Sequence, residues 1–307
     1  MKKIDFLKYR YLFLIISVII IVSGLIYGFT TGFAFDVDFK GGTNIQVDLK
    51  EPFDNNDVSK VVEEQIGSKP TIQKVGTSGT TMVSITTNVI SNEEADKVVA
   101  ALKEKYINMD EPSTRNVQAT FGKETTNSAI KAVVLSVIAI LIYVAIRFRT
   151  LGLSAAITAI IAELHDVLIL VAMYAFLKLP INSTFVAVVL TIIGYSINDT
   201  IIVYDRIREN KRKAVKSTEL KNTINESLNQ TLTRTMYTSF TTIMAILIVY
   251  IFASINNQTV LKEFSLPLVI GIISGTYSSV FIATSLWYTI ENRMNKRKAA
   301  KSKVNDK

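Results

Sequence analysis

The apolar positions of the chain fall into six long runs. Each run has about 20 residues or more and few charges, which is the length that an α-helix needs to cross the hydrocarbon core of a bilayer. The runs cover residues 11–30, 128–146, 151–177, 183–204, 235–255 and 264–290. This pattern predicts a polytopic α-helical membrane protein with six transmembrane helices. The first run is too long for the apolar part of an ordinary signal peptide, so we expect an uncleaved anchor.

Between the first two runs, residues 31–127 show the pattern of a small α+β domain. Apolar residues alternate in some stretches and recur at helical spacing in others. In chain order we expect a strand at 44–49, a helix at 56–67, strands at 71–75 and 81–87 joined by a turn at 76–80, a helix at 91–106 and a strand at 116–121. The order β-α-β-β-α-β is typical of the ferredoxin-like arrangement, with two helices on one face of an antiparallel sheet.

Two short motifs mark helix ends in this domain. Ser91 followed by Glu94 forms a capping box, which predicts the start of the second helix. Gly67 is expected to end the first helix, because glycine readily adopts the left-handed conformation common just after a helix. Both signals agree with the order of elements expected from the apolar pattern.

Charged residues make up 20% of a chain that is 49% hydrophobic, so the charge must be segregated from the apolar runs. Most of the 34 Lys and Arg residues lie in four segments, 1–10, 147–150, 205–234 and 291–307. Basic residues are enriched in cytoplasmic loops near the ends of spans. We therefore expect a plasma-membrane protein with both termini in the cytoplasm and with residues 31–127 outside it.

Several classes of function are not indicated. Membrane asymmetry and anionic lipid account for the net charge of +8, so nucleic acid need not be invoked. The chain has no cysteine, which excludes disulfides and thiolate chemistry. Residues 31–127 contain no histidine to complete a catalytic triad. Asp166 and Asp199 are expected about 11 Å apart in depth, too far for the shared-proton pair of an intramembrane protease.

Asp199 is the most conspicuous residue of the fourth run, since it lies between Ile197 and Ile201 with no basic residue before Arg206. A charge at the centre of a bilayer costs roughly 2.5–3.5 kcal/mol unless it is protonated, paired or hydrated, and it marks a functional site. Polar residues recur around it at helical spacing and are expected to form a stripe facing a partner or a cavity. The positions at helical spacing are Thr191, Tyr195, Asn198, Asp199 and Ile202. The supporting polar residues are Tyr195, Ser196, Asn198 and Thr200, together with His165 of the third run.

The third run holds Glu163, His165 and Asp166 near its middle. Glu163 and Asp166 are three positions apart and share a helix face, whereas His165 should point about 100° away from Asp166. We expect His165 to be a hydrogen-bonded supporting group, because a metal site needs at least three ligands and this spacing does not supply them. Asp166 and Glu163 are both candidate protonatable acids, and no metal or other cofactor is expected.

Three further patterns have ordinary structural interpretations. The glycines of Asp38-Phe39-Lys40-Gly41-Gly42-Thr43 favour a backbone turn at the membrane exit over a phosphate cradle. Gly271 and Gly275 form a pair of small residues four positions apart, which is typical of close helix packing. An amphipathic helix lying on the inner membrane face or on a partner is predicted by Leu220, Ile224, Leu228 and Leu232.

Several of these motifs resemble the SecD/SecF family of bacterial protein-export membrane subunits, and in particular its SecF members. The most specific match is Gly194-Tyr195-Ser196-Ile197-Asn198-Asp199-Thr200, followed by Asp205-Arg206-Ile207-Arg208-Glu209-Asn210. Other matching stretches are the Asp38 to Thr43 motif, His165-Asp166-Val167, Gln230-Thr231-Leu232-Thr233-Arg234-Thr235 and Phe264-Ser265-Leu266. The resemblance covers almost the whole chain.

The resemblance implies a six-span half of the resistance-nodulation-division architecture that pairs with a SecD-like subunit near a SecYEG-type channel. In that family the pair uses the proton-motive force to pull unfolded preproteins outward across the bacterial plasma membrane, so H⁺ is the expected driving ion. The family's membrane carboxylate and its basic partner carry over onto Asp199 and Arg234. Because the chain starts directly at its first run, a SecD-like subunit is expected to be a separate polypeptide. Glu163 departs from the family pattern and is either an extra protonatable site or a structural acid.

Two other functions fit a polytopic protein with intramembrane acids. One is a proton-coupled efflux half-transporter for a lipid or small molecule, although a drug-efflux protein should have two large outside domains and about twice as many spans. The other is a non-conducting assembly scaffold in which Asp199 only holds the spans together. The scaffold predicts that neutralising Asp199 leaves transport intact and weakens assembly.

Overall fold

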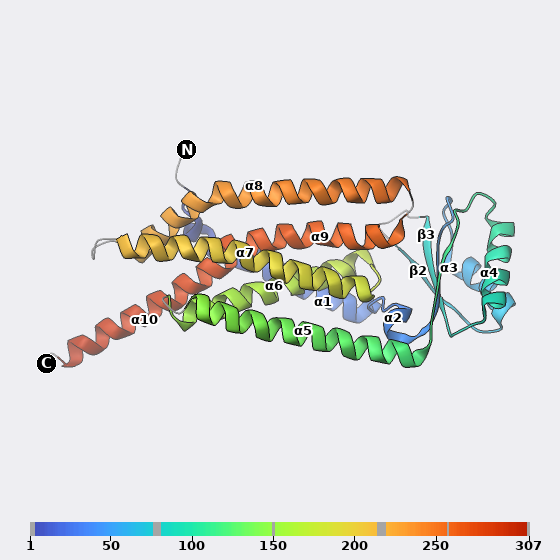
Figure 1. The fold of residues 1–307 in the computed structure, drawn as a ribbon, viewed down its shortest axis with the longest axis horizontal. Coiled ribbons are helices and arrows are strands. Elements are labelled where there is room, and N and C mark those ends of the chain that lie inside the picture. Colours follow the sequence, from blue (N-terminus) through green and yellow to red (C-terminus); the bar gives the residue numbers. More distant parts are fainter. Residues whose placement is uncertain (1–3, 76–80, 149–150, 214–218, 257, 306–307) are drawn as a thin grey trace. The chain divides into compact units, whose positions relative to one another are not determined.

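The structure, a computed structural model, describes residues 4–75, 81–148, 151–213, 219–256 and 258–305 (Figure 1). The chain forms two compact units. The helical unit comprises residues 1–23, 135–171 and 188–307, and the sheet unit comprises residues 24–134 and 172–187. Each unit has a hydrophobic core of its own.

Six helices within the described residues are long and apolar enough to cross a membrane, which confirms the six predicted spans. They extend past the apolar runs at several ends, because helical hydrogen bonding continues into polar sequence. The helices concerned are α1 (Arg10–Thr31), α5 (Ala119–Arg147), α6 (Leu153–Leu177), α7 (Ser183–Lys213), α8 (Leu220–Ile255) and the continuous series α9 (Thr259–Tyr277), η2 (Ser278–Ala283) and α10 (Thr284–Asn305). A short 3₁₀ helix, η1 (Phe6–Tyr9), precedes α1, and η2 is a π-helical turn.

The core of the helical unit is built around large aromatic side chains at one end of α7. Tyr204 is fully buried, and its ring centroid lies 5.1 Å from that of Phe148, which directly follows α5, and 6.0 Å from that of Trp287 on α10. The Tyr204 hydroxyl lies 2.8 Å from the Thr158 hydroxyl on α6, so the polar atom of this buried ring has a partner. Four helices are therefore held together beside the charged end of α7.

The amphipathic segment expected on the membrane surface has a different position. It is helical, as predicted, but it forms the first part of α8 and is continuous with the fifth span. Ile224 and Leu228 are buried in the core of the helical unit, and Leu220 and Leu232 pack against it. The expected surface location is therefore wrong, because this apolar face finds its partner within the same chain.

The start of α8 is also tied to the N-terminal segment by polar contacts. Lys221 donates a hydrogen bond to the Asp5 carboxylate at 2.7 Å, and Asn225 donates another at 2.7 Å. The bond from Lys221 holds the pKa of Asp5 below its ordinary value, with Asn225 adding to the effect. These contacts hold η1 against α8.

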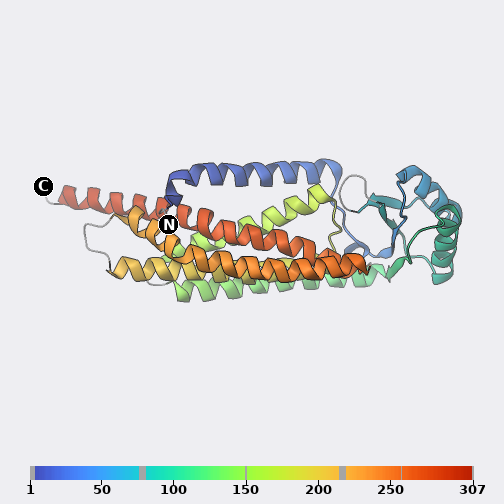
Figure 2. The same cartoon turned by 90° about the horizontal axis from the view of Figure 1, so that it is seen from above.

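Helices α8 and α9 form an antiparallel hairpin and run side by side in both views (Figures 1 and 2). The glycines of α9 lie against α7 instead. A Cβ added at Gly271 would lie 1.9 Å from Ile192 Cδ1, and one at Gly275 would lie 2.9 Å from Ser196 Cβ. The predicted close packing at these two glycines is confirmed.

The sheet unit contains the predicted ferredoxin-like arrangement. Its four strands are antiparallel in the spatial order β2-β3-β1-β4, and α3 and α4 cover one face of the sheet (Figure 1). The core lies between those helices and strands β1 and β3, with Ile45, Ile85, Val62 and Leu102 fully buried. The elements are α2 (Val37–Lys40), β1 (Gly42–Asp48), α3 (Asn55–Ile66), β2 (Thr71–Lys74), β3 (Met82–Thr87), α4 (Asn92–Lys105) and β4 (Ser113–Val117).

The predicted helix ends of this unit are confirmed, whereas its last strand was misplaced. Ser91 and Glu94 form the capping box at the start of α4, and Gly67 ends α3 in the left-handed conformation. The strand expected at 116–121 is instead β4, and α5 begins at Ala119. Pairing explains the difference, because β4 can extend only as far as Val117, which pairs with Gly42 at the start of β1. The predicted turn at 76–80 lies outside the described residues.

Candidate functional site

Asp166 on α6 is fully buried, and its carboxylate accepts hydrogen bonds from three serines of the helical unit. Ser196 on α7 donates at 2.6 Å. Ser274 on α9 and Ser278 on η2 each donate at 2.7 Å. Hydrogen bonds of this length are short for hydroxyl donors. Asp166 on α6 is therefore linked to α7, α9 and η2.

His165 also contacts Asp166, although helical geometry predicted that the two side chains point apart. His165 Nδ1 lies 3.0 Å from Asp166 Oδ1, and the histidine ring centroid lies 5.9 Å from that of Tyr277. The imidazole turns about its side-chain bonds to reach the neighbouring carboxylate, which the direction of Cβ alone does not reveal. The expected role as a hydrogen-bonded supporting group is confirmed, and the expected direction is wrong.

Glu163 lies one turn before Asp166 and is in a less favourable environment. It is 6% exposed, interacts electrostatically with Asp166, and neither of its carboxylate oxygens has a hydrogen-bond partner among the described residues. Ser196 lies near both acids, but its single hydroxyl proton goes to Asp166. Within the part of the chain that the structure describes, no three His, Cys, Asp or Glu side chains gather to hold a metal ion. Glu163 is thus a buried acid without a donor.

Asp199 on α7 is 1% exposed and belongs to a second set of hydroxyls. Thr276 on α9 donates to its carboxylate over a long distance, 3.4 Å, and the Thr276 hydroxyl lies 2.6 Å from that of Ser239 on α8. The Tyr195 hydroxyl in turn lies 3.5 Å from Ser239 Oγ. The Asp199 carboxylate is therefore held much more loosely than that of Asp166.

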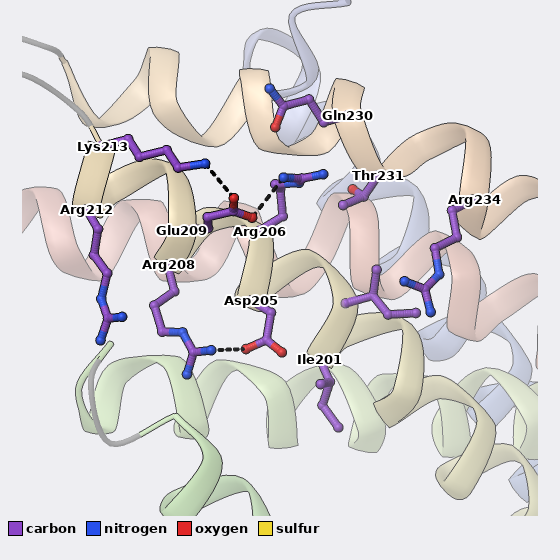
Figure 3. Close-up of a pocket in the computed structure, with 11 residues that line it drawn as sticks. Ile201, Asp205, Arg206, Arg208, Glu209, Arg212, Lys213, Gln230, Thr231 and Arg234 are labelled. Carbon is purple, nitrogen blue, oxygen red and sulfur yellow. Dashed lines mark hydrogen bonds and ion pairs between the residues drawn. The ribbon is translucent and has the colours of Figure 1, made fainter.

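Arg234 on α8 is the basic residue that interacts electrostatically with Asp199. Among the described residues, the two side chains form no ion pair within 4.0 Å, so they interact at longer range. Arg234 is exposed and lines a cavity that also reaches along the charged end of α7 (Figure 3). The sequence-predicted pair is thus brought into electrostatic range without being locked together.

The predicted polar stripe on α7 divides between two faces. Ser196 and Thr200 are fully buried, and the Thr200 hydroxyl lies 2.8 Å from that of Ser279 on η2. Tyr195 is half-buried, whereas Asn198 is exposed. Asn198 lies away from the line of Ser196 and Thr200, as expected at 3.6 residues per turn, and its predicted place in a stripe facing a partner or a cavity stays a prediction.

Four hydroxyl residues of this region were not assigned to the site from the sequence. Their hydroxyls contact one of the two aspartates directly, or contact a residue that does. They are Ser239, Ser274, Thr276 and Ser278. The available signal was the recurrence of small polar residues beside Gly271 and Gly275, which was interpreted only as close packing. Ser274 and Ser278 are far from Asp166 in the sequence, so their hydrogen bonds to it could not be predicted from local spacing.

In the sheet unit, the Asp38 motif forms a turn, as expected. The Asp38 carboxylate accepts a hydrogen bond from the Ser183 backbone N–H at 3.0 Å and another from the Ser183 hydroxyl. Gly41 follows α2 with φ +74°, and Gly42 has φ +127°, where a Cβ would lie 2.3 Å from the Thr87 carbonyl oxygen. Phe39, the residue after Asp38, lines an apolar cavity. Both glycines are thus needed for the path of the backbone.

Asp36 immediately precedes this turn and caps α2. Burial raises the pKa of its carboxyl, although Arg115 lies 3.4 Å away and opposes the shift. Its carboxylate accepts a hydrogen bond from the Val37 N–H at 2.8 Å. The connection from α1 to the sheet is therefore held by buried polar contacts as well as by the glycines.

Comparison with known protein families gives a consistent result. A family model described as "Protein export membrane protein SecD/SecF, C-terminal" matches residues 97–293. The protein translocase subunit SecF of Sebaldella termitidis is 33% identical over 303 residues, covering 98% of this chain and 96% of the relative. The SecF subunit of Calditerrivibrio nitroreducens is 38% identical over 300 residues, covering 95% of each chain.

Longer relatives contain a matching region as part of a single chain. The protein translocase subunit SecDF of Bacillus subtilis is 34% identical over 97% of this chain and 40% of its own length. The crystal structure of SecDF from Thermus thermophilus, a translocon-associated membrane protein, superimposes with a TM-score of 0.80 at 29% identity, over 94% of this chain and 39% of that one. The chain thus spans about two fifths of these SecDF proteins and nearly the whole of the shorter relatives.

Proposed function

Because this chain belongs to the SecD/SecF family of protein-export membrane proteins, we propose that it is the SecF-type subunit of a Sec protein translocase. The similarity to SecF subunits over almost their full lengths supports this function. Subunits of this kind are transport components rather than enzymes. The six spans and the ferredoxin-like sheet match the solved SecDF architecture.

The proposed driving force is the proton-motive force, acting on Asp199. The observation that carries this proposal is the burial of the Asp199 carboxylate with only a long hydrogen bond from Thr276 and no ion-pair partner among the described residues. Protonation would remove its charge and with it the interaction with Arg234. A site that binds neither the ionised nor the protonated carboxyl group tightly can exchange a proton while α7 and α8 shift between two arrangements.

The available energy is sufficient for such a shift. Moving one elementary charge across 100 mV is worth about 2.3 kcal/mol, which changes a two-state ratio by about fiftyfold. Asp166 differs from Asp199, because its carboxyl group contacts three serine hydroxyls and His165 at short distances. We assign Asp166 the role of a hydrogen-bonded support beside the exchanging acid, and Glu163 that of a secondary acid with a smaller contribution.

The proposed partners are a SecD-like subunit, a SecYEG-type channel, unfolded preproteins and the lipid bilayer. The SecDF relatives support the first of these, since more than half of each longer chain lies outside the matching region. The location is the bacterial plasma membrane, with both termini cytoplasmic and the sheet of residues 31–127 outside. The concentration of basic residues in four segments supports this orientation.

The test is secretion of a preprotein by membrane vesicles that contain the chain and its SecD-like partner, with the proton gradient intact or collapsed. Asp199→Asn and Arg234→Met should abolish the gradient-dependent part of secretion while the complex still assembles. Glu163→Gln should reduce that part to a smaller extent. Glu226→Gln is the matched control, because Glu226 is an exposed acid on α8 away from the buried acids.

Three outcomes separate the alternatives. Normal gradient-dependent secretion by Asp199→Asn would end the proton-coupling proposal. If the same variant secretes normally but assembles poorly with its partner, the chain acts as a scaffold. If secretion never depends on the chain but proton-driven extrusion of a lipid or small molecule does, the chain is an efflux half-transporter.

A further inference from the structure

A cavity of about 750 Å³ in the helical unit lies between the charged end of α7 and α8 (Figure 3). Its cationic lining residues are Arg206, Arg208, Arg212, Lys213 and Arg234, against which stand only two acids. The proton-coupling proposal uses Arg234 alone. The cavity therefore carries an excess of positive charge that this mechanism does not need.

The two acids of the cavity are already engaged by other cations. Asp205 pairs with Arg208 at 3.3 Å and also with Arg147 on α5. Glu209 pairs with Arg206 at 2.8 Å and with Lys213 at 2.6 Å. Among the described lining residues, five cations thus stand against two acids, so the lining keeps a net positive charge.

Arg212 and Arg234 are the two cations that remain after this pairing, and Arg234 already interacts with Asp199 at longer range. Arg212 forms no ion pair within the described parts of the chain, and its side chain extends in the same direction as that of Arg208 (Figure 3). A guanidinium presents several N–H donors in a planar fork that matches the oxygens of a phosphate group. Adjacent arginines in an open cavity thus form a site suited to a phosphate anion.

Two apolar side chains also line the cavity, near Asp205 and Arg234 (Figure 3). Ile201 and Ile202 of α7 line it at the point where the helix passes from apolar to charged sequence. A ligand that fills the cavity would place a charged group near Arg212 and an apolar part against these isoleucines. That division is the chemistry of a phospholipid headgroup and its glycerol end, and basic pockets between transmembrane helices commonly bind anionic headgroups.

We propose that this cavity binds a phosphate group, supplied by the headgroup of an anionic phospholipid. Free phosphate shares the recognised chemistry and is the other source. The proposed phosphate contact is centred on Arg212, which is distinct from the Asp199–Arg234 pair of the proton-coupling proposal. Occupation of the cavity would nevertheless place an anion in the space that Arg234 also lines.

Native mass spectrometry of the full chain tests the proposal. The chain is purified in detergent with phosphatidylglycerol or, for comparison, with phosphatidylcholine of the same acyl chains. The wild-type chain should retain phosphatidylglycerol in preference to phosphatidylcholine. Arg212→Gln should lower that retention about fivefold, the effect expected for one basic residue near an anionic lipid, and Arg206→Gln with Arg212→Gln should lower it further. Lys296→Gln is the control, because Lys296 is exposed on α10 and does not line the cavity.

A titration with inorganic phosphate identifies the source. Displacement of phosphatidylglycerol at millimolar phosphate, lost in Arg212→Gln, would assign the site to the free ion, whereas no displacement assigns it to the lipid. Equal retention by Arg212→Gln and Lys296→Gln, with no phosphate binding by the wild type, would overturn the proposal. Thermal unfolding of each variant checks its fold.

Asp199→Asn separates this site from the proposed function. It should retain phosphatidylglycerol as the wild type does, even where gradient-dependent secretion is lost. A variant at Arg212 that loses lipid but keeps the gradient response would likewise leave the proton-coupling proposal intact. The two proposals can therefore fail independently.

Discussion

At the scale of single residues, the two acids of α6 differ in what surrounds their oxygens. Asp166 accepts hydrogen bonds from three serine hydroxyls and contacts His165, whereas the carboxylate oxygens of Glu163 have no partner among the described residues. A buried carboxylate is stabilised by donors and destabilised by lost hydration. Burial alone therefore does not indicate whether an acid stabilises or destabilises the fold, because the number of hydrogen-bond donors around its oxygens also matters.

This contrast predicts opposite sensitivities to substitution. Asp166→Asn places an amide NH₂ against hydroxyl donors and should destabilise the protein by about 1–3 kcal/mol, the cost of leaving buried polar groups unpaired. Glu163→Gln removes a buried carboxyl that has no donor and should leave stability unchanged or raised. Thermal unfolding of both variants in detergent measures the difference. A larger loss of melting temperature for Glu163→Gln would contradict this account of the cluster.

At the scale of elements, α9 presents a glycine face to α7 and a serine face to α6. Gly275 allows the backbone of α9 to approach Ser196, and Ser274 and Ser278 on either side of it reach Asp166. The π-helical turn η2 begins at Ser278 and carries Ser279, whose hydroxyl pairs with Thr200. Such turns occur often at functional sites because they change which side chains face inward.

Gly275→Ala should therefore disturb the site through packing. The new Cβ would lie 2.9 Å from Ser196 Cβ, so one of the two helices must move, and an overpacked contact costs about 1–3 kcal/mol. Gly194→Ala is the matched control, because a Cβ at that helical glycine meets nothing within 4 Å and should stabilise α7 by about 0.5–1 kcal/mol. Melting temperatures in detergent compare the two. Equal tolerance of both changes would argue against close packing of α9 on α7.

At the scale of the whole molecule, charge and hydropathy together predict which segments lie on which side of the membrane. The basic segments 147–150 and 205–234 connect spans at one end of the helices, and segment 1–10 precedes the first span at that same end. The sheet of residues 31–127 begins where the first span ends, on the opposite side. Basic flanks favour the cytoplasm. The sheet, which has a core of its own, is then expected to be the large outside segment.

Cysteine labelling tests this orientation, since the chain has no cysteine of its own. Lys97→Cys on α4 and Lys296→Cys on α10 both replace exposed side chains. A membrane-impermeant thiol reagent should label position 97 in intact cells or spheroplasts and position 296 only after lysis. The reverse pattern would invert the topology and place the sheet in the cytoplasm.

Features that depend on neighbouring residues were predictable. The six spans follow from the length of apolar runs, and the order of strands and helices between the first two follows from periodicity and from the Ser91 capping box. Asp199 was identifiable because a single acid in an apolar run is costly wherever the helix packs. These properties act over one or two helical turns, so the sequence alone determined them.

Contacts between distant residues depended on the tertiary structure. Ser274 and Ser278 are more than 100 positions from Asp166, and only the packing of α9 on α6 and α7 turns them into donors for its carboxylate. Packing also buried the leucine face of α8 and ended β4 at its pairing with β1. Each outcome depends on which surface a helix or strand meets, and that surface is created by the other elements of the fold.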